Sequence, residues 1–230
     1  MTEKTKITYY GQSLFLIESS KGVKIGIDPY NKFVRAKLPD IEADMALVTH
    51  SHQDHSNISL FKGNPEVIKT TGINTIEGIS IEGLPSYHDS RKGLIRGKNI
   101  IFRFEVDGIV FCHLGDLGDI PDADLISKLK DVNILFIPIG GFFTIDYKTA
   151  FEVIKKISPS IAIPMHYRDK SSRIKILDKI DNFLKLVNDY KLMESTINIS
   201  KYDLPKNTEV WVLKSSWYQS IYFIFYQLIN

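Results

Sequence analysis

The pattern of apolar and polar positions divides the chain into a strand-rich first half and a second half in which helices and strands alternate. "ITYYGQSLFLIESSKGVKIGIDPY" alternates around the turn signal "SSKG", which predicts two or three antiparallel strands ending at Asp28. The apolar run "MALVT" predicts another strand, which delivers the chain to His50. "NIIFRFEV" and "GIVFCHLGD" flank an Asp-Gly dipeptide, which is typical of tight hairpin turns. The second strand of this hairpin then brings His113 and Asp116 to its far end.

The second half predicts two successive helix–strand units. "PDADLISKLKD" opens with proline and acids, as a helix N-terminus prefers, and precedes the buried-looking strand "NILFIPIGG". The helix "DYKTAFEVIKKI" and the strand "SIAIPMHY" repeat this order and bring His166 to a strand terminus. Apolar residues at three- and four-residue intervals between 172 and 191 predict a long amphipathic helix over a sheet. A last strand, "EVWVLK", closes what we expect to be one domain.

Composition and charge narrow the choice of partners. The 230 residues include 29 Lys and Arg against 27 Asp and Glu, and a net charge of +2 gives no support for a nucleic acid or a membrane surface as the main partner. One cysteine, Cys112, cannot form an internal disulfide, and "MTEKTKITYYGQ" lacks the apolar stretch of a signal peptide, so we expect a cytoplasmic protein. The aromatic-rich residues 217–230 are too few to span a bilayer, and no transmembrane segment is expected. Packing of this tail on the body or on a second subunit is the favoured interpretation, which allows a homo-oligomer.

Histidines concentrate in the stretch "THSHQDHSN". Three of the chain's six histidines and one aspartate fall there within six consecutive residues: His50, His52, Asp54 and His55. Imidazole and carboxylate are the usual ligands of zinc and similar divalent ions, and this spacing suits an extended turn better than a helix face. The other three histidines also lie at or near predicted strand ends, where ligands gather in layered α/β folds: His88, His113 and His166. The sequence therefore supplies enough ligands for two metal ions.

These motifs resemble those of the metallo-β-lactamase superfamily of metal-dependent hydrolases, and they occur in that family's order. They are Asp28 at a strand end, "HSHQDH" as His-x-His-x-Asp-His, His88 in "SYHDS", Asp116 in "LGDLG" and His166 in "PMHY". The surrounding residues look most like the branch related to L-ascorbate-6-phosphate lactonase. The resemblance covers roughly residues 7–214, so we expect a hydrolase domain at 1–214 and a tail of open role at 215–230. It implies an α/β fold of the αββα type, a four-layer sandwich of two mixed β-sheets with helices outside.

The resemblance also implies the ligand set of two divalent metal ions. His50, His52 and His88 would bind the first ion, Asp54, His55 and His166 the second, and Asp116 would bridge both. Asp28 would orient a ligand from behind. A hydroxide shared by the two ions would be the nucleophile, and Asp54 and Asp116 would be the catalytic carboxylates, with Asp54 also carrying a proton to the leaving group. Zinc is the favoured metal, although Mn²⁺, Fe²⁺ and Ni²⁺ accept the same ligands.

Several residues keep more than one interpretation. His113 fits a buried histidine bonded to the backbone, a group that orients a ligand, or an acid for the leaving group. Arg91, Tyr167 and Arg168 flank the ligand-bearing loops and could receive an anionic substrate group, but surface charge explains the two arginines equally well. Cys112 is interpreted as a buried thiol.

The expected reaction is metal-dependent hydrolysis of a small-molecule lactone, ester, amide or phosphodiester. Redox members of the superfamily usually carry a glutamate where His52 stands, which favours hydrolysis over oxygen chemistry. Two alternatives stay open. One is an RNA or nucleotide phosphodiesterase, and the other is a metal-bound scaffold without turnover.

Overall fold

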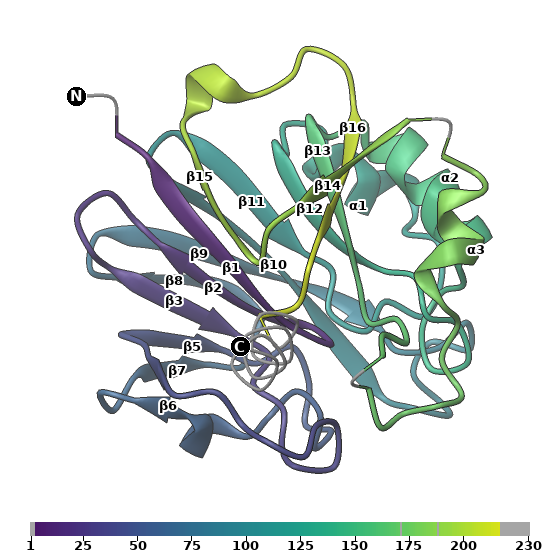
Figure 1. The fold of residues 1–230 in the computed structure, drawn as a ribbon, viewed down its shortest axis with the longest axis horizontal. Coiled ribbons are helices and arrows are strands. Elements are labelled where there is room, and N and C mark those ends of the chain that lie inside the picture. Colours follow the sequence, from purple (N-terminus) through teal and green to yellow (C-terminus); the bar gives the residue numbers. More distant parts are fainter. Residues whose placement is uncertain (1–2, 171, 188, 217–230) are drawn as a thin grey trace, which may run out of the picture.

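Two β-sheets pack face to face in the computed structural model, which describes residues 3–170, 172–187 and 189–216. The helices α1 to α3 lie beside the outer face of the larger sheet (Figure 1). The tail from Trp217 lies outside the described residues. Ser215 and Ser216, just before it, are tied to the body by a bond from Ser215 Oγ to Asp169 Oδ2 (3.2 Å) and from the Ser216 N–H to the Tyr9 carbonyl (3.0 Å).

The smaller sheet has six strands in the order β15-β1-β2-β3-β5-β7. The strands β1, β2 and β3, which are consecutive in the chain, form the predicted antiparallel meander. β3 then pairs in parallel with β5, and β5 pairs in parallel with β7. The strands are β1 (Thr5–Gly11), β2 (Leu14–Glu18), β3 (Lys24–Ile27), β5 (Met45–Leu47), β7 (Glu66–Ile68) and β15 (Thr196–Ile199). A separate two-stranded ribbon consists of β4 (Ile41–Glu42) and β6 (Phe61–Lys62).

The larger sheet has eight strands in the order β14-β16-β13-β12-β11-β10-β9-β8. They are β8 (Gly72–Ile76), β9 (Ile79–Tyr87), β10 (Lys98–Val106), β11 (Ile109–His113), β12 (Ile134–Pro138), β13 (Ile161–Met165), β14 (Tyr190–Met193) and β16 (Glu209–Leu213). The predicted hairpin joins β10 to β11, and both of its turn residues, Asp107 and Gly108, have positive φ angles of 51° and 73°. This left-handed backbone matches the twist of the flanking strands, which is why an Asp-Gly pair predicts the turn.

Helices follow the strands of the second half as expected, and two of them begin at aspartate caps. They are α1 (Ala123–Lys128), α2 (Tyr147–Ile157) and α3 (Ile180–Leu184), with 3-10 turns η1 (Ile58–Leu60) and η2 (Lys201–Asp203). The Asp122 and Asp146 carboxylates accept the N–H groups of Leu125 and Thr149, which would otherwise lack partners in the first turn. Among the described residues, no helix is long and apolar enough to cross a membrane.

Three apolar cores hold these layers together. The first lies between the sheets and includes Phe15, Phe102 and Phe136, each fully buried. The second lies between the larger sheet and the helices, and the third covers the outer face of the smaller sheet beneath loops and the β4–β6 ribbon. The predicted layered α/β sandwich of two mixed sheets is confirmed, and the outermost layer over the smaller sheet consists largely of loops.

The long helix predicted across residues 172–191 is wrong, since α3 occupies only five residues of this stretch. The Asp178 backbone bonds in both directions to the ends of neighbouring strands, accepting the Arg168 N–H (2.8 Å) and donating to the Gly140 carbonyl (2.8 Å). Ile174 and Leu177 pack into the third core, whereas Phe183 packs into the second. The apolar residues of this stretch therefore do not form one face of a helix, because the earlier ones pack into the third core and the later ones into the second.

Candidate metal centre

The strand order brings the predicted ligands to one edge of the sandwich. Asp28 and His50 follow β3 and β5, which run parallel, and His88, Asp116 and His166 follow β9, β11 and β13 of the larger sheet. β9 and β11 both pair antiparallel with β10, and β11 to β13 are parallel, so their carboxyl ends lie at the same edge. Loops from both sheets meet there, which is where α/β folds commonly place a site.

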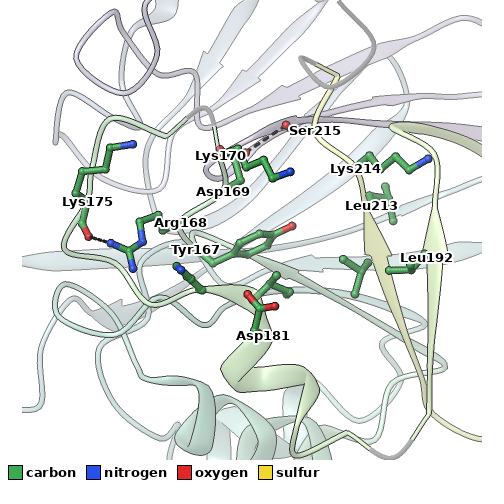
Figure 2. Close-up of a pocket in the computed structure, with 13 residues that line it drawn as sticks. Tyr167, Arg168, Asp169, Lys170, Lys175, Asp181, Leu192, Leu213, Lys214 and Ser215 are labelled. Atoms are coloured by element: carbon green, nitrogen blue, oxygen red, sulfur yellow. Dashed lines mark hydrogen bonds between the residues drawn. The ribbon is translucent and has the colours of Figure 1, made fainter. Parts of the chain in front are cut away.

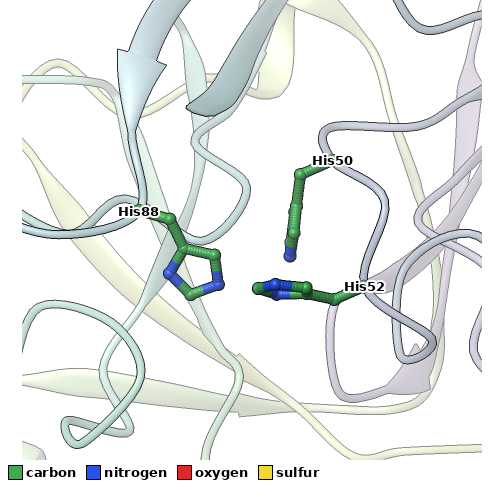
Figure 3. Close-up of side chains that lie close together, drawn as sticks. All are labelled: His50, His52 and His88. Atoms are coloured by element: carbon green, nitrogen blue, oxygen red, sulfur yellow. The ribbon is translucent and has the colours of Figure 1, made fainter. Parts of the chain in front are cut away.

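Three histidine rings form the first half of this cluster (Figure 3). The ring centroids of His50 and His52 are 4.7 Å apart, those of His50 and His88 are 4.7 Å apart, and those of His52 and His88 are 4.9 Å apart. One nitrogen of each ring lies within 4.8 Å of the others. The predicted convergence of His88 on the motif at residues 50–55 is therefore present.

Asp54, His55, Asp116 and His166 form the second half, again with ligand atoms within 4.8 Å of one another. Asp116 reaches both halves. Its Oδ1 lies 3.2 Å from His55 Nε2, and its Oδ2 lies 3.3 Å from His166 Nε2 and 3.1 Å from His88 Nε2. This carboxylate is placed where the predicted bridging group should be.

Several buried polar atoms of the cluster have no hydrogen-bond partner, which is costly unless something else satisfies them. They are His50 Nε2, His55 Nε2, His88 Nδ1, both nitrogens of His166 and Asp116 Oδ1. Imidazole nitrogens and carboxylate oxygens that converge in this way are the donor set that divalent ions use. The residues present therefore fit metal ions at this site.

Asp28 and Thr49 contact two of the candidate metal-binding histidines at the ring nitrogen that faces away from the cluster. The Asp28 carboxylate is fully buried, accepts the Thr49 N–H (2.9 Å) and the Thr49 hydroxyl (2.8 Å), and lies 2.8 Å from His55 Nδ1. Thr49 Oγ1 also lies 3.0 Å from His50 Nδ1. Partners on the outer nitrogen fix the tautomer and leave Nε2 for a metal. Asp28 thus contacts His55 directly and His50 through Thr49, and its orienting role stays a prediction.

Burial and charge move the pKa values of the histidines in opposite directions. Burial lowers the pKa of His50 to about 3. Burial also opposes protonation of His55 and His166, but Asp116 beside both rings outweighs it, raising the pKa of His166 to about 9 and that of His55 well above its usual value. Burial raises the pKa of Asp116, yet the nearby His166 and His55 hold it well below the ordinary range. The carboxylates of the second half therefore favour protonation of the two rings beside them, whereas a bound cation would favour their neutral form.

His113 lies one layer below the cluster, and both of its ring nitrogens have backbone partners. Its Nε2 donates to the Ser13 carbonyl (3.0 Å), and its Nδ1 accepts the Gly115 N–H (3.1 Å). Burial lowers the pKa of His113, so the ring is neutral, and these contacts favour the interpretation of a buried histidine bonded to the backbone. Cys112, on the opposite face of β11, is buried, and burial raises the pKa of its thiol.

The candidate substrate contacts are not all brought to the cluster. Tyr167 and Arg168 line a separate cavity of about 650 Å³, and none of the cluster residues line its wall (Figure 2). There the Arg168 Nη1 donates to the Lys175 carbonyl (2.6 Å). Arg91 is exposed on the loop that follows His88, and of the three it is the one that does not line this cavity.

Sequence reasoning missed other residues that hold the ligand loops. The Asn99 Nδ2 donates to the Leu114 carbonyl (2.9 Å), and its Oδ1 accepts the Asp116 N–H (3.0 Å). The Asp89 carboxylate accepts four backbone N–H groups of the loop after His88. Gln12, in the β1–β2 turn, donates to Asp54 Oδ2 (3.1 Å). "YYGQS" indicates only a turn, and no sequence spacing relates residue 12 to residue 54.

Comparison with known proteins gives concordant results. The family model of the Beta-lactamase superfamily domain matches residues 6–166. The UPF0173 metal-dependent hydrolase of Thermoplasma volcanium is 35% identical over 188 residues, covering 70% of this chain and 83% of its own, and that of Pelotomaculum thermopropionicum is 31% identical over 193 residues, covering 70% and 84%. The crystal structure of a metallo-β-lactamase superfamily protein from Thermotoga maritima matches with a TM-score of 0.75 and 34% identity, covering 91% of this chain and 98% of that one. The metallo hydrolase Igni18 of Ignicoccus hospitalis, at 22% identity, covers 86% of this chain and 99% of its own with a TM-score of 0.67 and shares the fold.

The layered sandwich and its histidine–aspartate edge thus define a protein of the metallo-β-lactamase superfamily. Within it, the chain belongs to the UPF0173 family of metal-dependent hydrolases.

Proposed function

We propose that this protein is a hydrolase that uses two divalent metal ions, with zinc favoured, to cleave a small-molecule lactone, ester, amide or phosphodiester. The observation that carries the proposal is the pair of ligand groups, three histidines in one and two histidines with two aspartates in the other, whose ligand atoms lie within 4.8 Å of one another in each group. Three of these nitrogens are buried and without a hydrogen-bond partner: His50 Nε2, His55 Nε2 and His166 Nε2. Zinc sites use imidazole and carboxylate ligands of this kind, and open coordination positions leave room for water and substrate.

Each half of the cluster would hold one ion. His50, His52 and His88 would hold the first, and Asp54, His55 and His166 the second. Asp116, which lies within 3.3 Å of histidines from both groups, would bind both. Divalent ions at such a site activate water at neutral pH and polarise the attacked carbonyl or phosphoryl oxygen.

Asp54 is the carboxylate best placed to exchange a proton with a substrate. Its side chain is 20% exposed, whereas that of Asp116 is 2% exposed. Burial raises the pKa of Asp54, but His55 and His166 outweigh it and keep the carboxylate ionised, which is the form that would bind a metal and from which the proposed proton transfer to the leaving group would start. Asp116, closed off from solvent, positions the histidines around it.

The substrate we propose is small, and an anionic group on it would find cations on the loop after His88. Arg91 and Arg96 both belong to this loop, and the Arg96 guanidinium lies 5.7 Å from the Phe142 ring centroid across the edge of the sandwich. Asp89 holds the loop in shape through its four backbone bonds. The net charge of +2 gives no support for a polyanion such as RNA as the substrate, which makes RNA cleavage the weaker candidate.

Elemental analysis combined with a substrate panel tests the proposal. The purified protein is assayed against lactones, esters, amides and phosphodiesters before and after treatment with a chelator, and again after Zn²⁺ is restored. We expect bound metal, turnover of one class, loss with the chelator and recovery with the metal. Bound metal with no turnover on any class would instead support a scaffold.

A further inference from the structure

The β1–β2 turn, which belongs to neither ligand group, reaches into the cluster through Gln12. This residue is 2% exposed and has a positive φ of 55°, a conformation that non-glycine residues rarely adopt. Backbone strain of this kind persists only where surrounding contacts impose it, and it concentrates at functional sites. Surrounding contacts must therefore hold the Gln12 backbone in this conformation.

The Gln12 main chain is tied to the end of β13. Its carbonyl accepts the His166 N–H (2.8 Å) and the Tyr9 hydroxyl (3.0 Å). His166 has a positive φ of 53° as well, so two strained backbones face each other across this bond. The Tyr9 ring is 2% exposed and stacks on Phe15 at 4.6 Å between centroids, which anchors the turn in the core between the sheets.

The Gln12 side chain is directed at the other ligand loop. Its Nε2 donates to Asp54 Oδ2 (3.1 Å), the same oxygen that lies 3.4 Å from His55 Nε2 and 3.7 Å from His166 Nε2. An ionised carboxylate can only accept hydrogen bonds, so the amide must present its nitrogen to it. One residue thus contacts two of the three non-bridging ligands of the second group, one through its main chain and one through its side chain.

We propose that Gln12 is a positioning residue of the second metal site, which fixes the Asp54 carboxylate relative to His166 through its amide. The inference rests on the proposed function, because it assumes that Asp54 and His166 bind a metal. Of the described residues, Gln12 is the one that hydrogen-bonds Asp54 by its side chain from outside the cluster of histidines and aspartates. Partners of this kind orient a metal ligand, and their loss typically lowers metal affinity by about 10- to 100-fold.

The test replaces the amide and keeps the backbone contacts. Gln12→Met preserves length and volume in a buried position but has no N–H to donate, while the main-chain bonds to His166 and Tyr9 remain. Gln53→Met is the matched control, because Gln53 is exposed beside Asp54 and its Oε1 accepts from Asn31 (3.3 Å) rather than facing the cluster. Zn²⁺ affinity is measured by competition with a chelating dye, and the site geometry by the visible spectrum of the Co²⁺-loaded protein.

We expect Gln12→Met to weaken Zn²⁺ binding at one of the two sites by about 10- to 100-fold and to alter the Co²⁺ spectrum, while Gln53→Met changes neither. Gln12→Met and Gln53→Met are also made in an Asp54→Ala background, which leaves the Gln12 amide no acceptor at position 54. There the effect of Gln12→Met should shrink to twofold or less, because the amide acts through Asp54. Gln12→Asn, which withdraws the amide by one methylene, is the second variant and should show the same loss.

Two results would overturn the inference. Unchanged Zn²⁺ affinity and Co²⁺ spectrum in both Gln12 variants would show that the amide does not position the ligand. A loss of equal size with Asp54 and with Ala at position 54 would show a general effect of the turn on the fold. If the wild-type protein itself binds neither ion, the proposed function fails and the inference fails with it, which distinguishes that case from a failure confined to Gln12.

Discussion

Replacing Asp28 with asparagine should weaken metal binding through a histidine that the substitution does not touch. The carboxylate accepts two bonds from Thr49 and contacts His55 Nδ1 at 2.8 Å, all in a fully buried position. An asparagine keeps one carbonyl oxygen for the Thr49 N–H and turns an NH₂ group toward His55. The ring must then accept at Nδ1, so its one remaining proton sits on Nε2, the nitrogen that faces Asp54 and Asp116, and the tautomer that frees Nε2 loses its acceptor at Asp28.

The size of the effect follows from these contacts. A metal would have to displace that proton and pull the ring into its less favoured tautomer, so we expect Zn²⁺ affinity to fall by about 10- to 100-fold, or roughly 1.4–2.7 kcal/mol. The metal-free protein should lose about 1.5–3 kcal/mol of unfolding free energy, as for a buried hydrogen bond to a charged group. Dye competition measures the first quantity and urea denaturation the second.

Asp107 supplies the control for this experiment. Like Asp28 it sits at a positive φ, and it accepts hydrogen bonds from Thr5 and Ser20, but it lies in the β10–β11 turn. Asp107→Asn should lower stability and leave Zn²⁺ affinity unchanged. If Asp28→Asn binds Zn²⁺ within twofold of the wild type, the argument from the His55 tautomer is refuted.

Three further outcomes follow from the structure. Because Asp116 raises the pKa values of His55 and His166, and a metal needs both rings without a proton at the binding nitrogen, metal binding at pH 7 should release protons and its affinity should rise with pH; calorimetry in two buffers of different ionisation enthalpy would contradict this by finding no proton release. Gly118→Ala should distort the ligand loop, since a Cβ there would lie 2.2 Å from the His88 carbonyl carbon, and we expect weaker metal binding by dye competition, with wild-type affinity as the refuting result. Phe136→Ala in the core between the sheets should cost about 3–5 kcal/mol in chemical denaturation, and a loss below about 1 kcal/mol would show that this core is not packed as described.

The sequence predicted the elements whose signals are local. Alternating positions and an Asp-Gly turn predicted the meander and the β10–β11 hairpin, and an opening proline with acids and the apolar spacing predicted the first two helices, because each signal depends on neighbours in the chain. The spacing of apolar residues after 172 misled, because Ile174 and Leu177 serve one core and Phe183 another. The edge strands β14 and β15 were not predicted, since they are short and half of the β15 side chains face solvent.

The ligand residues were predicted for a different reason. Histidines are rare in this chain, and the motif order suggested that distant ones meet, which the positions of His88 and His166 bear out geometrically. Supporting contacts escaped prediction, because Gln12 and Asn99 are common polar residues whose role depends on distances across the fold. The candidate substrate contacts Tyr167 and Arg168 were chosen for adjacency to His166 in the chain, but β13 ends there and the next residues turn to another cavity.

Anomalous diffraction from crystals of the Zn²⁺-loaded protein, recorded on both sides of the zinc absorption edge, tests the central claim most directly. We predict two zinc peaks, one among His50, His52 and His88 and one among Asp54, His55 and His166, with Asp116 in contact with both. No peak at this edge of the sandwich, or zinc bound only elsewhere on the protein, would contradict the account.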